Sequence, residues 1–244
     1  NTYGPDLQDG SFETLNQALP QLDNPVKLAL FDDTWSWGKP YFDSFWENAP
    51  DLSKTEAAAQ KIYTGKWKPF YEQVPREHWY LFQERPFIYF YNGGTLKPTS
   101  EAAPVIARLK ALFEADFGVE PFVAVDRAFF ADSRMPETAD AKFTWFTLDA
   151  PGHKSSETLN GVTLDHAMVK WDEMGRSHPG EIADASDRII KDAEILQQVL
   201  NSSQDADVLV LATWNDLGEG TGINRNYDYY IDGEWKKPDY FMQF

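Results

Sequence analysis

The stretch Asp207-Val-Leu-Val-Leu-Ala212, which continues into Thr213-Trp-Asn-Asp-Leu-Gly-Glu-Gly220, is the most informative part of this chain. A continuous apolar run of this length is typical of a strand buried on both faces, as in the parallel sheets of α/β proteins. The run leads into an indole, an amide and two carboxylates, Asp216 and Glu219. Two carboxylates at the carboxyl end of a barrel strand are the groups that cleavage of a glycosidic bond needs. The same spacing also fits a helix cap, with Asp216 as the N-cap residue and Glu219 at the third helical position.

Four other segments have the composition of buried strands, because they are short, apolar and rich in β-branched or aromatic residues. With the first, the predicted strands are residues 26–32, 86–91, 121–126, 143–149 and 207–214. Polar side chains follow their ends, namely Asp32, Asp33, Tyr91, Asn92, Asp126, Asp149 and Asp216. Since the carboxyl ends of parallel strands meet at one edge of a sheet or barrel, we expect a functional site there.

Helices are predicted between these strands from apolar residues that recur at helical spacing. The predicted helices are residues 12–18, 54–63, 67–82, 99–117 and 186–200. The region 149–181 is rich in Gly, Pro, His and Ser, and we expect a long loop there, either at the cleft or as a surface excursion.

The alternation of strands and helices predicts an α/β fold of the (β/α)8 TIM-barrel type in a single domain over residues 1–244. A closed barrel needs eight strands, and about five are recognisable. We therefore expect the chain to cover the carboxyl-terminal five or so strands, with hidden strands or an open sheet as alternatives. The chain begins at Asn1 without Met, which we interpret as a processed or partial chain.

Composition narrows the possible partners. The chain of 244 residues has a net charge of −17, so its surface should repel nucleic acid and anionic membranes. No apolar run approaches the roughly 18 residues of a membrane span, and we expect no membrane insertion. Cysteine is absent, which excludes thiolate zinc sites and favours an extracellular or periplasmic location.

Aromatic residues make up 15% of the chain, and many of them lie in short clusters. Aromatic rings fill cores, and they also stack on the apolar faces of sugar rings. The candidate stacking residues are Trp35, Trp37, Tyr91, Trp145 and Trp214. Trp37 and Trp214 lie just past predicted strands, which favours the cleft, whereas the other three suit a core equally well. Asn224 and Tyr227 follow the carboxylate segment and either line the site or form a turn.

The remaining polar candidates have structural alternatives. Asp32 or Asp33 could bind a pair of sugar hydroxyls, and structural pairing explains them as well. Asp126 is followed by Arg127, so an ion pair is the alternative to sugar binding. The histidines, three of which are His153, His166 and His178, lack metal-ligand spacing, and we expect surface or loop positions. Since no nucleotide-binding or serine-hydrolase motif is present, we expect no cofactor and no metal.

The segment Thr213-Trp-Asn-Asp-Leu-Gly-Glu-Gly-Thr221 resembles the Asn-Glu-x-x-Glu-Gly-Thr segment of endo-α-mannosidase-type glycoside hydrolases (family ninety-nine) and their bacterial WbsX-like relatives. The segment Leu28-Ala-Leu-Phe-Asp-Asp-Thr-Trp-Ser-Trp37 also resembles an uncharacterised bacterial domain related to that group. The resemblance implies a (β/α)8 barrel in which the first segment ends a late strand.

The resemblance also implies roles for the two carboxylates. The first, at Asp216, would assist the sugar's own 2-hydroxyl, which attacks the anomeric carbon to give a 1,2-anhydro sugar. The second, at Glu219, would act as general acid on the leaving oxygen and then as base for water. Asp216 is one methylene shorter than the family's glutamate, and a displacement near one ångström can lower a rate about a hundredfold.

Three hypotheses follow. The first is a glycoside hydrolase that cleaves a neutral poly- or oligosaccharide, with Glu219 as acid/base and Asp216 as its partner; Asn215 and the strand-end residues would bind the carbohydrate. The second is a non-catalytic glycan-binding barrel, which the shorter Asp216 favours. The third is a structural domain of a larger surface protein.

Overall fold

The computed structural model describes residues 11–34, 49–92, 96–145, 154–168, 171–172, 188–189, 193–212, 229–231 and 234–236. The chain divides into two compact units, Asn1–Lys142 and Phe143–Phe244, and each is described by itself. The single domain expected over residues 1–244 therefore stays a prediction.

The first unit is an α/β layer. Its helices are α1 (Ser11–Ala18), η2 (Leu19–Gln21), α2 (Thr55–Ile62), η4 (Tyr63–Trp67), α3 (Lys68–Gln73), η5 (Arg76–His78), η6 (Thr99–Glu101), α4 (Ala102–Phe117), η7 (Arg127–Ala131) and α5 (Met135–Thr138). Its strands are β1 (Leu30–Asp33), β2 (Leu81–Phe82), β3 (Arg85–Tyr91), β4 (Phe122–Asp126) and β5 (Ala141–Phe143), the last of which extends one residue past the unit boundary. The strand order is β1-β3-β4-β5, with β2 beside β3. β3 runs parallel to both β1 and β4, as the strand–helix alternation predicted.

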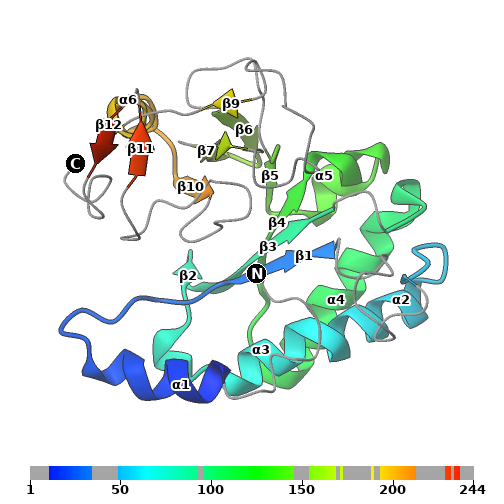
Figure 1. Cartoon of the computed structure of the whole chain (residues 1–244). Helices are drawn as coiled ribbons and strands as arrows, with labels where there is room; N and C mark the ends of the chain where they lie inside the picture. The colour runs from blue at the N-terminus through cyan, green and yellow to red at the C-terminus, as the bar shows by residue number, and fades with distance from the viewer. Residues whose placement is uncertain are drawn as a thin grey trace, which may run out of the picture. The chain divides into compact units, whose positions relative to one another are not determined.

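One face of this sheet packs on helices, and Figure 1 shows α2, α3 and α4 along it. The ring of Phe90 in β3 contacts Trp67 at 5.7 Å and Phe129 at 5.0 Å between ring centroids. α4 buries a stripe of small and apolar side chains that includes Val105, Ile106 and Leu109. It ends at Gly118, whose φ of 74° is a left-handed conformation that glycine adopts without strain.

The opposite face of the sheet carries aromatic side chains, because successive residues of a strand point to opposite sides. Phe87 stacks on Phe122 at 5.6 Å and on Tyr89 at 6.5 Å. Phe31 of β1 contacts Tyr89 at 5.5 Å. β3 is therefore buried on both faces over most of its length, which explains its continuous apolar sequence.

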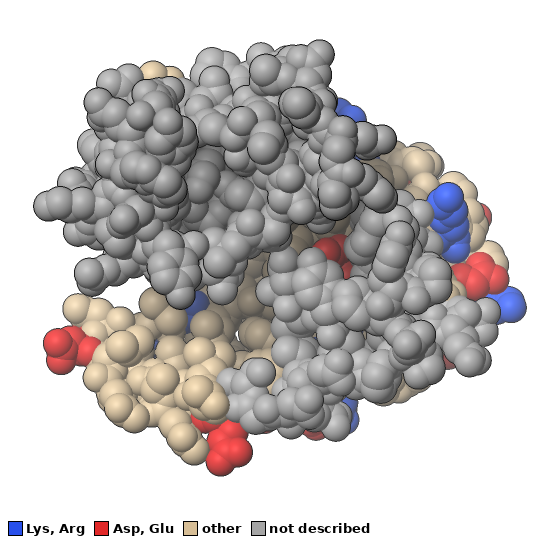
Figure 2. All heavy atoms as spheres, in the orientation of Figure 1, with Lys and Arg blue, Asp and Glu red and all other residues tan. Residues whose placement is uncertain are grey.

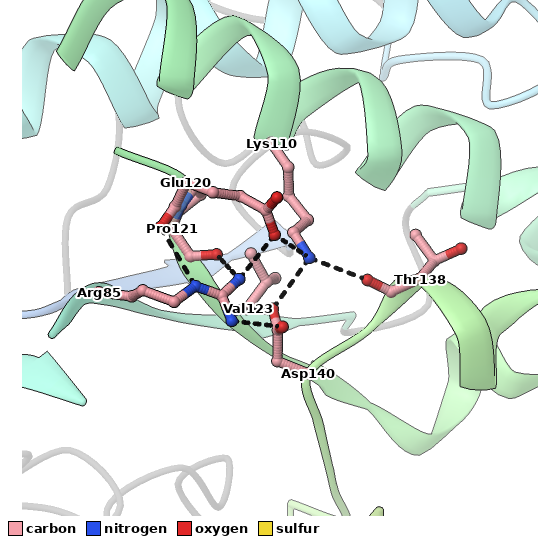
Figure 3. Close-up of polar contacts among 7 residues, drawn as sticks. All are labelled: Arg85, Lys110, Glu120, Pro121, Val123, Thr138 and Asp140. Carbon is pink, nitrogen blue, oxygen red and sulfur yellow. Dashed lines mark hydrogen bonds and ion pairs between the residues drawn. The ribbon is translucent and has the colours of Figure 1, made fainter. Parts of the chain in front are cut away.

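The amino-terminal edge of the sheet is held by an ion-pair network, shown in Figure 3. Arg85, at the start of β3, lies 2.7 Å from Glu120 and 2.8 Å from Asp140. Lys110 of α4 reaches the same two carboxylates, at 2.7 and 3.1 Å. Asp140 also accepts the Val123 backbone N–H at 2.8 Å. The network joins β3, α4 and the residues before β4 and β5.

The second unit contains β6 (Ser155–Leu159), β7 (Val162–Met168), β8 (Trp171–Asp172), β9 (Arg188–Ile189), α6 (Ala193–Ser202), β10 (Val208–Ala212), β11 (Tyr229–Ile231) and β12 (Glu234–Lys236). β10 runs parallel to β7, and β6 pairs antiparallel with β7. Ala167 of β7 packs with Leu196 and Val199 of α6. This sheet also has one face on a helix.

The structure corrects the predictions for the region 149–181. The expected loop over 149–181 contains the hairpin β6–β7, whose turn is Asn160-Gly161 with φ of 52° and 78°. Asn-Gly is the preferred pair for such a turn, so this signal was present in the sequence. His166 lies in β7 and is fully buried, in contrast to the surface or loop position expected for it.

Other element boundaries moved. The helix predicted over 67–82 ends at Gln73, because the residue before Pro75 is disfavoured in the helical region, and β2 follows. Arg188 and Ile189, predicted as helix, pair with β8. The predicted strand 26–32 begins at Leu30. The helices predicted at 12–18, 54–63 and 99–117 are confirmed within about one turn.

In the part of the chain that the structure describes, no helix is long and apolar enough to cross a membrane. On the face seen in Figure 2, the described acidic and basic side chains are interspersed and form no single patch.

Candidate functional site

The carboxyl ends of β1, β3 and β4 bring together several residues that the sequence predicts at a site. The register pairs Asp32 with Phe90 and Asp33 with Tyr91. Phe90 pairs with Val125, so Tyr91 and Asp126 lie at the next level of the two strands. Side chains at one level of a parallel sheet point to the same face. Successive side chains of a strand point to opposite faces, so the side chains of Asp32 and Asp33 lie on opposite faces of the sheet.

Asp32 points to the helix face and is fully buried. Its carboxylate accepts a hydrogen bond from the Lys66 ammonium at 2.6 Å and another from the Trp67 indole N–H at 2.9 Å. Lys66 also donates to the backbone carbonyl of Asp33 at 2.7 Å. Both donors come from the π-helical turn η4, so this turn fixes the end of β1. The structure thus shows the structural pairing that was the alternative for Asp32, and sugar binding by Asp32 stays a prediction.

Asn92 follows β3 on the same face as Asp32 and is also buried. Its side-chain carbonyl accepts the Thr34 hydroxyl at 3.1 Å and the Leu96 N–H at 3.3 Å. Asn92 therefore connects the end of β1 to the chain that follows β3.

Asp33, Tyr91 and Asp126 lie on the opposite face, at the last level of the three strands, and we call them the edge row. Neighbouring strands are about 4.8 Å apart, so the backbones of Asp33 and Asp126 are separated by about 10 Å with Tyr91 between them. Tyr91 stacks on Phe31 with ring centroids 6.1 Å apart and an interplanar angle of 23°. Asp33 and Tyr91 are half-buried, and Asp126 is 7% exposed.

The carboxyl group of Asp126 has an unusual affinity for a proton. Burial raises its pKa from 3.8 to about 6, against the lowering effects of the Ala128 N–H and the Arg127 charge. The Ala128 N–H donates to Asp126 Oδ1 at 2.7 Å. Burial, and then the charge of Asp126, also raise the pKa of Tyr89, which precedes Tyr91 by two residues on the same face of the sheet. A carboxyl group with a pKa near 6 exchanges protons readily around neutral pH, which suits proton transfer or hydrogen-bond donation.

In the second unit, Trp145 stacks on His166 with ring centroids 4.7 Å apart and an interplanar angle of 28°. His166 pairs with Val210 and points away from the face that packs on α6. Burial lowers the pKa of His166 to about 3, so its ring is neutral at physiological pH. On the α6 face, the buried carboxylate of Asp165 lies 2.6 Å from the ammonium group of Lys154, whose side chain is partly exposed; no sequence motif indicated this ion pair.

The other predicted site residues lie outside the described residues. They are Trp35, Trp37, Trp214, Asn215, Asp216, Glu219, Asn224 and Tyr227. The strand predicted over residues 207–214 is β10, which covers Val208–Ala212 and is followed in the sequence by the segment Thr213–Thr221; residues 213 and 214 lie outside the described residues. Among the described residues, no group of three or more His, Asp or Glu side chains is arranged to hold a metal ion.

The family model described as "Domain of unknown function (DUF5010)" matches residues 10–239. The chain belongs to this family. No curated protein gives a significant match. Among solved structures, the chain is similar to the GH99 endo-alpha-mannosidase from Bacteroides thetaiotaomicron, with a TM-score of 0.59 and 15% sequence identity over 99% of this chain and 70% of the other. At this identity the likeness shows the fold, and it confirms the α/β fold class of the barrel type.

Proposed function

We propose that this chain is a glycoside hydrolase that cleaves a neutral poly- or oligosaccharide outside the cytoplasm. The observation that carries the proposal is the position of the Trp-Asn-Asp-Leu-Gly-Glu-Gly segment. It begins at Trp214, two residues after β10 ends at Ala212, and β10 is a parallel strand in a chain whose fold is similar to that of a GH99 endo-alpha-mannosidase. Sites of barrel enzymes are built from the residues that follow such strands.

In this proposal Glu219 is the general acid that protonates the leaving oxygen and then the base that activates water. Asp216 remains ionised and assists the attack at the anomeric carbon. The two groups need different pKa values, because one must carry a proton while the other carries a charge. Gly218 and Gly220, on either side of Glu219, allow a substrate to approach the backbone closely.

The test is reducing-sugar release from α- and β-linked mannans, glucans and galactans by the wild type and by Glu219→Gln. We expect release by the wild type and loss of at least a thousandfold in Glu219→Gln. Glu77→Gln, at an exposed position in η5, is the matched control and should leave the rate unchanged. A Glu219→Gln variant within a few-fold of wild type would show that another group is the acid.

A second candidate is a glycan-binding protein without catalysis, which the shorter Asp216 favours. Asp216→Glu separates the two candidates. If the missing methylene limits turnover, this substitution raises the rate, whereas a binding protein that lacks other parts of the machinery stays inactive. Binding of a glycan by the wild type without release of sugar from any substrate would support the second candidate.

A further inference from the structure

The edge row combines an aromatic ring with two carboxyl groups on the sheet face opposite α2, α3 and α4. Parallel pairing places Asp33 beside Tyr91, and the next strand places Asp126 on the other side. The rows below it, which contain Phe87, Tyr89 and Phe122, are buried and aromatic. The edge row is the level at which this face becomes both polar and partly exposed.

Tyr91 is supported from within the sheet. Its ring stacks on Phe31, and Phe31 in turn contacts Tyr89, so the Tyr91 ring is oriented by a neighbour that is itself packed within the sheet. Because the ring is already held in place, little side-chain entropy is lost when a ligand binds. The ring can therefore stack on the apolar face of a ligand.

The two carboxyl groups differ in character. Asp33 is half-buried, and its backbone carbonyl is held by Lys66. Asp126 is almost fully buried and accepts one backbone N–H. Hydrogen bonds from two sides, above an apolar floor, are typical of small-molecule sites in which a few polar groups fix the orientation of the ligand.

We propose that the edge row binds one neutral pyranose ring of a glycan. Tyr91 is the stacking platform, and Asp33 and Asp126 bind hydroxyl groups on opposite sides of the ring. The spacing of two strands between the carboxylates leaves room for one sugar ring. This inference rests on the proposed function and extends it by naming a subsite in the first unit, separate in sequence from the segment Thr213–Thr221.

The test is calorimetric binding of three tetrasaccharides, α-linked mannotetraose, cellotetraose and β-linked galactotetraose, to Glu219→Gln protein, which does not consume them. Tyr91→Ala should weaken binding of the preferred tetrasaccharide at least tenfold, and Tyr91→Phe should retain it within threefold. Asp33→Asn and Asp126→Asn keep the side-chain shape and should each weaken binding several-fold. Melting temperatures of all variants establish that they are folded.

Tyr80→Ala is the matched control, because Tyr80 packs on Phe87 near the opposite end of β3, with ring centroids 5.6 Å apart. Its affinity should equal that of the parent. If wild-type turnover depends on Glu219 but Tyr91→Ala and Tyr80→Ala bind equally well, the subsite is wrong and the proposed function stands. If the wild type neither binds nor cleaves any glycan, both are wrong.

Discussion

Replacing Lys66 by methionine removes the ammonium group that lies 2.6 Å from Asp32 in the core of the first unit. Methionine has a similar length and keeps the apolar contacts of the stem. The side chains of Lys66 and Asp32 are 4% and 0% exposed, so water does not replace the lost partner. Removal of one member of a buried ion pair costs about 3–5 kcal/mol, because the other charge is left without compensation.

The indole N–H of Trp67 remains 2.9 Å from Asp32 and retains part of the compensation. We therefore expect Lys66→Met to lower the free energy of unfolding by about 3 kcal/mol. Asp32→Asn should have a comparable effect. In the double variant the charges are absent together, so the loss should be smaller than the sum of the two by about 2 kcal/mol.

Urea unfolding followed by circular dichroism measures these differences. With a slope of about 2–3 kcal/mol per molar urea, Lys66→Met should lower the midpoint by about 1 M or more. Lys68→Met is the matched control, since Lys68 lies two residues further along the helix and pairs with Asp116 at the surface. Its effect should be much smaller, because water screens exposed pairs. A loss below about 1 kcal/mol for Lys66→Met, or strict additivity in the double variant, would refute the reasoning.

Two further predictions concern stability. Because native Asp126 has a raised pKa of about 6, the native state binds more protons than the unfolded chain between about pH 4 and 6. Stability should therefore fall by up to about 3 kcal/mol as pH rises through this range, and urea titrations should show a flatter pH profile for Asp126→Asn; an unchanged profile would contradict the assignment. Asp140→Asn should lower the free energy of unfolding by about 2 kcal/mol, because it weakens contacts with Arg85 and Lys110. Thermal unfolding should show a much smaller change for Glu56→Gln, whose partner Arg108 is exposed, and equal changes would mean that the network contributes little.

Local sequence was sufficient for the elements whose pattern is strong. The apolar runs of β3, β4 and β10 and the helical spacing of α4 predicted these elements within a few residues. Local sequence was insufficient where a two-residue turn motif lay within a segment whose overall composition is typical of a loop. The Asn160-Gly161 turn lay in a region that is otherwise rich in loop residues, and the hairpin around it was predicted as loop.

The candidate site shows the same division. The sequence indicated that polar residues follow the strand ends, and parallel pairing of β1, β3 and β4 brings Asp33, Tyr91 and Asp126 to one edge. The sequence favoured neither Asp32 nor Asp33 as a binding residue. It also suggested an ion pair between Asp126 and Arg127, whereas burial dominates the pKa of Asp126.

The sequence by itself determined the fold class and the edge at which the polar side chains gather, because both follow from periodicity and strand direction. Only the tertiary structure decided the role of each carboxylate. Asp32 and Asp33 are neighbours in the chain, but alternation sends Asp32 toward Lys66, which lies 34 residues away in the sequence, and Asp33 toward the opposite face. The environment of a buried charge depends on such distant partners, so no local pattern encodes it.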